Sequence, residues 1–317
     1  MTEHITLNLA GFQIGHATDE AFHTGCTVIL CPANTVGSAD VRGPAPGSRE
    51  TALLAPDKPN HHVNAVLLTG GSAFGLAAAD GVMRYLAERG LGHPTPIKPI
   101  PIVPTAVVFD LGFNWGQKHP DADMGYAACL AAGAGPIQQG NVGAGAGVTV
   151  GKWGGFEHMM KGGFGAASVA LGDLVVGAMA VTNPVGDVLN ADNSVLAGAR
   201  GENGRWLAEA HPLRYISEER MPQVGTNTTL VVVWTNARLT RPEAHRLAQR
   251  AHDGMATAVR PIHTTHDGDT AFALALGVVD APFNQVANAG AEMVAEAIRN
   301  GVRFAASLPL APGLLER

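Results

Sequence analysis

The chain has little charge for its 317 residues. Asp, Glu, Lys and Arg make up 15% of it, the net charge is −6, and Lys and Arg form no cluster. Nucleic acids and anionic membranes attract basic surfaces, so both are excluded as expected partners. The low charged fraction also indicates that neighbouring subunits cover part of the surface, which predicts an oligomer.

Long apolar runs and secretion signals are missing too. No run approaches the 18 or more residues that a membrane span needs, and the start, Met1–His4, lacks the basic and apolar regions of a secretory signal. The three cysteines, Cys26, Cys31 and Cys129, are odd in number and form no CxxC pair. We therefore expect reduced core cysteines in a soluble, cytoplasmic protein.

Apolar residues and glycine are abundant. Hydrophobic residues make up 46% of the chain, and there are 40 glycines, which is typical of a globular protein with close backbone packing. The chain is long enough to bury a substantial core, and it contains no repeat, so a single domain over residues 1–317 is expected.

The order of apolar runs and helical patterns indicates the fold class. Strands are expected at 26–31, 63–69, 106–110, 164–171, 174–181, 228–234 and 270–279, and helices at 76–89, 120–133, 241–256 and 286–300. Loops are expected over 35–62, 94–104 and 192–222. Strands grouped with long helices, without a regular βαβ rhythm, favour a layered α+β sandwich over a doubly wound sheet.

The junction between Asn227 and Thr228 is the strongest chemical signal. A small polar turn from Gly225 ends here, and an apolar β-branched run to Val233 begins. A threonine hydroxyl at such a junction can attack the preceding carbonyl, move the acyl group to oxygen and leave an ester for water to hydrolyse. The freed Thr228 would carry an α-amino group, with a pKa near 8, as a base for its own hydroxyl. The simpler interpretation is a turn before a buried strand.

A glycine-rich stretch over residues 143–153 invites a phosphate-binding interpretation. It lacks the spacing of a Walker A loop, because Ala146 stands where glycine is needed and Trp153 follows the lysine. No nucleotide cofactor is therefore expected. The glycines instead indicate close backbone approach, which would deliver Lys152 into a site.

Two further segments carry polar groups. His263 to Thr270 contains Asp267 and Asp269, which would point the same way if extended and could orient a hydroxyl and an ammonium. Its spacing fits no helix-borne zinc motif, and a solvated turn is the plainer interpretation. Asn183 precedes a proline, so it is held extended, and its amide could donate to an oxyanion. A turn-forming asparagine is the alternative.

Six ordered segments together resemble one family. They are 68–76, 106–110, 143–153, 182–186, 227–229 and 263–270. They resemble the self-processing N-terminal-nucleophile aminopeptidases, which include L-aminopeptidase/D-amidase-esterases, β-peptidyl aminopeptidases and 6-aminohexanoate-oligomer (nylon oligomer) hydrolases. The Asp-Gly-Asp-Thr form and the threonine nucleophile look closest to the nylon-oligomer branch. The resemblance implies a four-layer α/β/β/α sandwich.

The resemblance also implies the chemistry. Thr228 matches the nucleophile released by a cut after Asn227, which would give chains 1–227 and 228–317. Lys152 matches a site lysine, Asn183 an oxyanion or hydrogen-bonding asparagine, and the two aspartates the pair that orients the nucleophile and its ammonium. The implied protein is a homotetramer that needs no cofactor or metal and hydrolyses small amides or short peptides with a free amino end.

One position departs from the family pattern. Phe109 stands where the family often has a tyrosine, which removes a hydroxyl that could assist the oxyanion.

Two other functions stay open. An acyltransferase of the ornithine acetyltransferase type would pass the acyl group to an amine, although that family has an Ala-Thr junction. A non-enzymatic oligomeric binding protein could keep the same fold.

Overall fold

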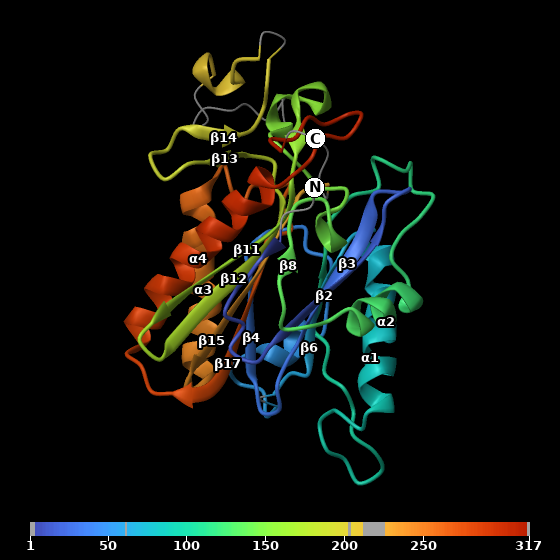
Figure 1. Ribbon diagram of the computed structural model, residues 1–317, viewed down its shortest axis with the longest axis vertical. Helices are drawn as coiled ribbons and strands as arrows, with labels where there is room; N and C mark the ends of the chain where they lie inside the picture. Colours follow the sequence, from blue (N-terminus) through green and yellow to red (C-terminus); the bar gives the residue numbers. More distant parts are fainter. Residues whose placement is uncertain (1–3, 61, 202–203, 212–225, 316–317) are drawn as a thin grey trace.

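The protein is built from four layers. The computed structural model describes residues 4–60, 62–201, 204–211 and 226–315. Two five-stranded sheets face each other, and a pair of helices covers the outer face of each sheet (Figure 1). The α/β/β/α sandwich expected for this chain is therefore confirmed.

The first sheet comes from the N-terminal part of the chain. Its strands, in spatial order, are β2 (Gln13–Asp19), β3 (Thr24–Leu30), β6 (Ala65–Thr69), β7 (Thr105–Val107) and β5 (Ser48–Arg49). Helices α1 (Ala78–Glu88) and α2 (Ala122–Leu130) cover it, and a 3₁₀ helix, Ser72–Ala77, precedes α1. Val28 and Leu67 of the sheet pack with Val82 of α1 in one apolar cluster.

The second sheet positions the functional site. Its order is β11 (Gly163–Leu171), β12 (Leu174–Asn183), β15 (Thr228–Ala237), β17 (Thr270–Val279) and β4 (Val36–Val41). Strands β15 and β17 are parallel, and the other neighbours are antiparallel. Helices α3 (Arg241–Ala258) and α4 (Phe283–Arg303) cover the outer face. Thr240 begins α3 with a capping box shared with Glu243.

Strand β15 is buried on both faces, which explains its apolar run over residues 230–234. Val231 and Val233 belong to the cluster under α3 and α4. Val232 and Trp234 belong to the cluster between the two sheets, together with Leu68 of the first sheet. Successive side chains of a strand point to opposite faces, so a strand with two buried faces favours a nearly continuous apolar run.

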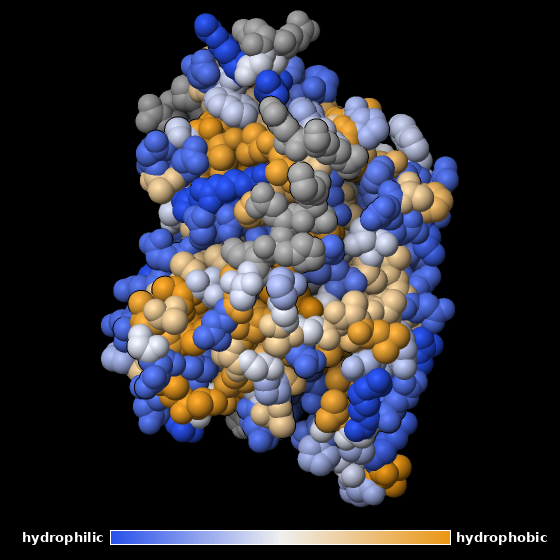
Figure 2. All heavy atoms as spheres, viewed as in Figure 1, coloured by the Kyte–Doolittle hydropathy of each residue, from blue (hydrophilic) through white to orange (hydrophobic). Residues whose placement is uncertain are grey.

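Short strands complete the architecture. They are β1 (His4–Ile5), β8 (Ile137–Gln138), β9 (Thr149–Val150), β10 (Met160–Lys161), β13 (Asp187–Leu189), β14 (Val195–Ala197) and β16 (Val259–Arg260). Hydrophobic and polar residues are interspersed over the face in Figure 2. None of the described helices combines the length and the apolar character that crossing a membrane requires.

The structure corrects some sequence-based expectations. The segment 35–62, expected to be a loop, contains β4, β5 and a 3₁₀ helix, Thr51–Leu54. Strand β2 was not expected at all. The expected loop 192–222 contains β14 and a short 3₁₀ helix, Leu207–Glu209, while 202–203 and 212–222 lie outside the described residues. The three cysteines are free, and Cys26 and Cys129 are buried as expected.

Candidate active site

The junction between Asn227 and Thr228 lies where β15 begins. Asn227 forms a parallel bridge with Asp267, and Thr228 is paired with Asn183 of β12. Both junction residues are buried, with exposed fractions of 0% and 6%. The junction, expected at the end of a small polar turn, is therefore held in place on both sides by backbone pairing.

Two donors meet on the carbonyl oxygen of Asn227. The Thr228 hydroxyl donates a hydrogen bond to it. The backbone N–H of Gly268 donates to the same oxygen at 2.9 Å. A Cβ on Gly268 would lie 2.8 Å from Thr228 Oγ1 and 2.6 Å from the Ala45 carbonyl oxygen, so only glycine fits here. A hydroxyl and a backbone donor thus converge on one peptide bond.

The two expected carboxylates lie on either side of Gly268, and both are fully buried. Asp269 Oδ1 accepts the Thr229 N–H at 2.5 Å. Asp267 Oδ1 accepts the Val185 N–H at 3.3 Å, and Oδ2 accepts the Thr264 N–H at 3.0 Å and its hydroxyl. Burial and the neighbouring charge of Asp269 raise the pKa of Asp267 to about 6.

Backbone hydrogen bonds fix the Asp267–Asp269 segment from the side opposite β15. The N–H groups of Arg42 and Gly43 both donate to the Asp269 carbonyl at 3.1 Å, and the Ala45 N–H donates to the Asp267 carbonyl at 3.1 Å. The plain interpretation of residues 263–270, a solvated turn, therefore does not hold for residues 267–270, which are buried, although Thr265 is exposed. The buried part carries two carboxylates next to the nucleophile candidate.

His263 is a residue of this site for which the sequence predicted no role. Its Nδ1 and its backbone N–H both reach Asp269 Oδ2, at 2.8 Å and 3.1 Å. Its backbone has a φ of 56°, a left-handed conformation that costs about 1 kcal/mol or more for a residue other than glycine. The ring packs edge to face against His252, with centroids 4.8 Å apart. A strained turn therefore directs His263 onto the carboxylate that holds Thr229.

Lys152 and Asn183 are joined on the other side of the junction. Lys152 Nζ donates to Asn183 Oδ1 at 2.8 Å and to its backbone carbonyl at 3.0 Å. Asn183 Nδ2 donates to the carbonyls of Phe109 and Thr226, at 3.3 Å and 3.4 Å. Burial lowers the pKa of Lys152 to about 7, although the charges of Asp267 and Asp269 oppose the shift.

The glycine-rich stretch does bring its backbone close to other segments. Gly151 has a φ of +72°, and a Cβ there would lie 2.2 Å from the Ala199 nitrogen. The next residue, Lys152, is 2% exposed. The expected close approach of the backbone and the inward position of Lys152 are thus both observed. The roles expected for Lys152, Asn183, Thr228, Asp267 and Asp269 stay predictions.

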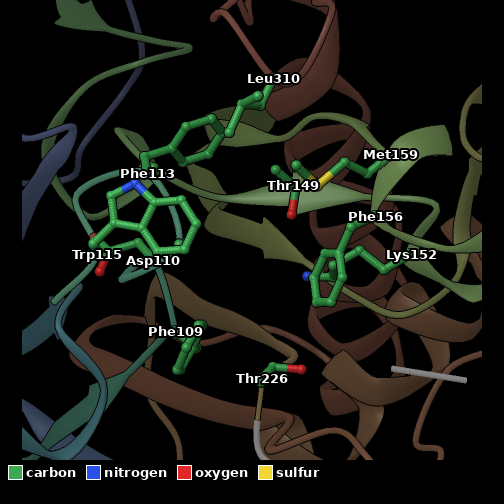
Figure 3. Close-up of a pocket in the computed structure, with 12 residues that line it drawn as sticks. Phe109, Asp110, Phe113, Trp115, Thr149, Lys152, Phe156, Met159, Thr226 and Leu310 are labelled. Carbon is green, nitrogen blue, oxygen red and sulfur yellow. The ribbon is translucent and has the colours of Figure 1, made fainter. Parts of the chain in front are cut away.

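A cavity of about 340 Å³ adjoins these residues. Its lining is mainly apolar, and Figure 3 shows aromatic rings arranged around it with Lys152 and Thr226 at its border. The lining residues are Phe109, Asp110, Gly112, Phe113, Trp115, Gly147, Thr149, Lys152, Phe156, Met159, Thr226 and Leu310.

In the part of the chain that the structure describes, no three His, Cys, Asp or Glu side chains are grouped to hold a metal ion.

The comparison with known families decides the relationship. A family model described as Peptidase family S58 matches residues 4–313. The chain belongs to this peptidase family. The S58 peptidase is thus a hydrolase that acts on amide bonds, and the family resemblance read from the sequence is confirmed.

Two relatives of the S58 peptidase are named for related activities. It is 40% identical over 290 residues to an "Uncharacterized aminopeptidase" of Mycobacterium tuberculosis, covering 87% of this chain and 82% of the relative. It is 34% identical over 287 residues to the 6-aminohexanoate-oligomer endohydrolase of Paenarthrobacter ureafaciens, covering 88% and 77%.

A solved structure agrees with the fold. The L-aminopeptidase D-Ala-esterase/amidase of Ochrobactrum anthropi matches the S58 peptidase with a TM-score of 0.71 at 19% identity, covering 100% of this chain and 92% of that chain. That structure is described as a variant of the Ntn-hydrolase fold. The fold expected from the sequence is therefore confirmed.

Proposed function

We propose that this S58 peptidase cuts itself between Asn227 and Thr228 and then hydrolyses amides with Thr228 as its N-terminal nucleophile. One observation carries the proposal. The Thr228 hydroxyl and the Gly268 N–H converge on the Asn227 carbonyl oxygen. Attack needs the hydroxyl beside the carbonyl, and a donor on the carbonyl oxygen stabilises the negative charge that develops there.

The cut proceeds in two balanced steps. Thr228 Oγ1 bonds to the Asn227 carbonyl carbon, the peptide C–N bond breaks, and the hydroxyl proton goes to the Thr228 nitrogen. Water then hydrolyses the resulting ester, which leaves a carboxylate on Asn227 and a free α-amino group on Thr228. The products are chains of residues 1–227 and 228–317.

Substrate hydrolysis repeats the same attack on an external carbonyl. The α-amino group takes the hydroxyl proton, an acyl ester forms on Thr228, and water releases the acid. Gly268 N–H already points at the position of the carbonyl oxygen. Asn183 Nδ2 donates to the Thr226 carbonyl before the cut, so departure of that segment would free it as a second donor to the oxyanion.

The buried charged groups set the electrostatics of this site. Asp269 accepts a hydrogen bond from the Thr229 N–H at the start of β15, and the His263 ring is hydrogen-bonded to its other oxygen. Asp267 and Asp269 favour an ammonium nearby, which fits the α-amino group that the cut creates. Lys152, with a pKa lowered to about 7, is partly neutral at neutral pH, so it can exchange a proton as well as donate a hydrogen bond.

The mass of the denatured protein tests this function without any substrate. We expect two chains in place of one, the smaller comprising 317 − 227 = 90 residues, and N-terminal sequencing of it should read Thr-Thr-Leu-Val-Val. Incubation of the cut protein with an amino-acid anilide should release the free acid. An uncut chain that hydrolyses the anilide, or transfer of the acyl group only to added hydroxylamine, would contradict the proposal.

We also propose a homotetramer that works in the cytoplasm on short amides or peptides with a free amino end. The free cysteines fit a reducing compartment. Large apolar side chains such as Ile97, Leu130 and Val278 are 91%, 63% and 69% exposed, which fits contact with other subunits. Light scattering at micromolar concentration should give the mass of four subunits. A monomer would refute the assembly and leave the chemistry untouched.

A further inference from the structure

The cavity that Thr226 and Lys152 help to line has the composition of a side-chain pocket. Phe109, Phe113, Trp115 and Phe156 contribute aromatic rings, and Met159 and Leu310 add apolar surface. In Figure 3 these side chains surround one space. Trp115 and Phe156 are 85% and 54% exposed, so apolar surface is available to a ligand at the mouth. Apolar walls with a few polar groups are typical of small-molecule sites.

The path of the uncut chain indicates which half of a substrate reaches this pocket. The acyl half of the junction runs backward from the Asn227 carbonyl to Thr226, and Thr226 lines the cavity. Asn183 ties Thr226 to Phe109 of the same lining, since its amide donates to the carbonyls of both residues. A substrate acyl group on Thr228 Oγ1 takes the place of the Asn227 carbonyl and therefore extends toward the same cavity.

The polar groups of the lining disfavour a basic side chain. Asp110 is the one carboxylate among the described lining residues, and it is 2% exposed. Its two oxygens already accept hydrogen bonds from the Thr24 hydroxyl and the Gly71 N–H, both at 2.7 Å. Lys152, the other ionisable group of the lining, repels a second cation when protonated. A cationic side chain would lose its water without gaining a carboxylate partner.

We infer that the preferred substrate carries a bulky apolar side chain, aromatic or branched aliphatic, on its acyl half, and that the cavity lined by Phe113 and Phe156 selects it. The inference rests on the proposed function of Thr228. A volume of about 340 Å³ lies at the small end of ligand pockets, which fits one such side chain rather than a long oligomer.

Aminoacyl p-nitroanilides that differ only in the side chain test the inference on the processed protein. The phenylalanine and leucine anilides should exceed the alanine anilide at least about 10-fold in kcat/KM, since each methylene in an apolar pocket contributes roughly 10-fold or more. They should exceed the lysine anilide about 100-fold, because the ammonium of lysine would lose its water in this pocket. Phe113→Ala and Phe156→Ala should each reduce the phenylalanine-to-alanine ratio, mainly through KM.

Phe74→Ala is the matched control. Phe74 is 66% exposed, stacks on His119 and does not line the cavity, so its removal should leave the ratio unchanged. A processed protein that hydrolyses the alanine or lysine anilide at least as well as the phenylalanine one overturns the pocket inference alone. So do Phe113→Ala and Phe156→Ala variants that both keep the parent ratio. An uncut protein that hydrolyses none of the anilides overturns the proposed function as well.

Discussion

Thr228→Ala should remain one uncut chain and hydrolyse no amide. The substitution removes the hydroxyl that donates to the Asn227 carbonyl, and no other group in the proposal forms the acyl ester. Cleavage should be absent by mass, and anilide hydrolysis should fall to background. Thr228→Ser keeps a hydroxyl at the same position, so it should still cut and hydrolyse.

Thr229→Ala is the matched control for this experiment. The Thr229 hydroxyl is adjacent to the proposed nucleophile, is buried and has no hydrogen-bond partner among the described residues. Its loss should leave cleavage after Asn227 intact. If Thr229→Ala blocks the cut while Thr228→Ala permits it, the nucleophile is one residue further along and the proposed assignment is wrong.

Asp267→Asn and Asp269→Asn should each lower hydrolysis by roughly 100-fold or more, the effect of losing a positioned acid–base partner. Both changes keep the side-chain shape and remove the charge that the ammonium of Thr228 would meet. In the parent protein the Asp269 carboxylate accepts hydrogen bonds from the Thr229 N–H and the His263 ring. The amide of asparagine has only one acceptor oxygen, so its N–H group would face one of these two donors. The kcat of each purified variant gives the measurement.

Asp173→Asn serves as the control, because Asp173 is exposed in the turn between β11 and β12, at the other end of β12 from Asn183. Circular dichroism and light scattering on every variant separate a local loss from unfolding. Normal cutting and hydrolysis by both Asp267→Asn and Asp269→Asn would remove the pair from the mechanism and leave the nucleophile as its only supported part.

Central strands were the most predictable part of the fold. Strand β15 is visible in the sequence as an apolar run, because both of its faces are buried. The same holds for β12, whose ten residues are all buried. Strands β2 and β4, each the outermost strand of its sheet, were not predicted, whereas β11, also outermost, was. Their sequences mix polar and apolar residues over partly buried positions, so neither a continuous run nor clean alternation is visible.

The candidate residues of the site could be chosen from the sequence, whereas their contacts could not. Each of Lys152, Asn183, Asp267 and Asp269 lies beside a strand end or tight turn that the sequence marks. The contact of His263 with Asp269 depends on a left-handed backbone conformation, which the spacing of the two residues does not encode. The cavity joins residues from Phe109 to Leu310, and only the folded chain brings these loops together.

The order of strands in the second sheet also determines what the cut does to refolding. Strands β15 and β17 follow the proposed cleavage point in the chain, yet they lie between β12 and β4, which precede it, so the proposed cut would leave two chains that interlock across the sheet. In the uncut protein the peptide bond holds both parts at a high effective concentration. After the proposed cut, a denatured molecule would regain its sheet only when two separate chains meet, at a rate that falls with dilution. The cut would thus convert a unimolecular folding reaction into a bimolecular one.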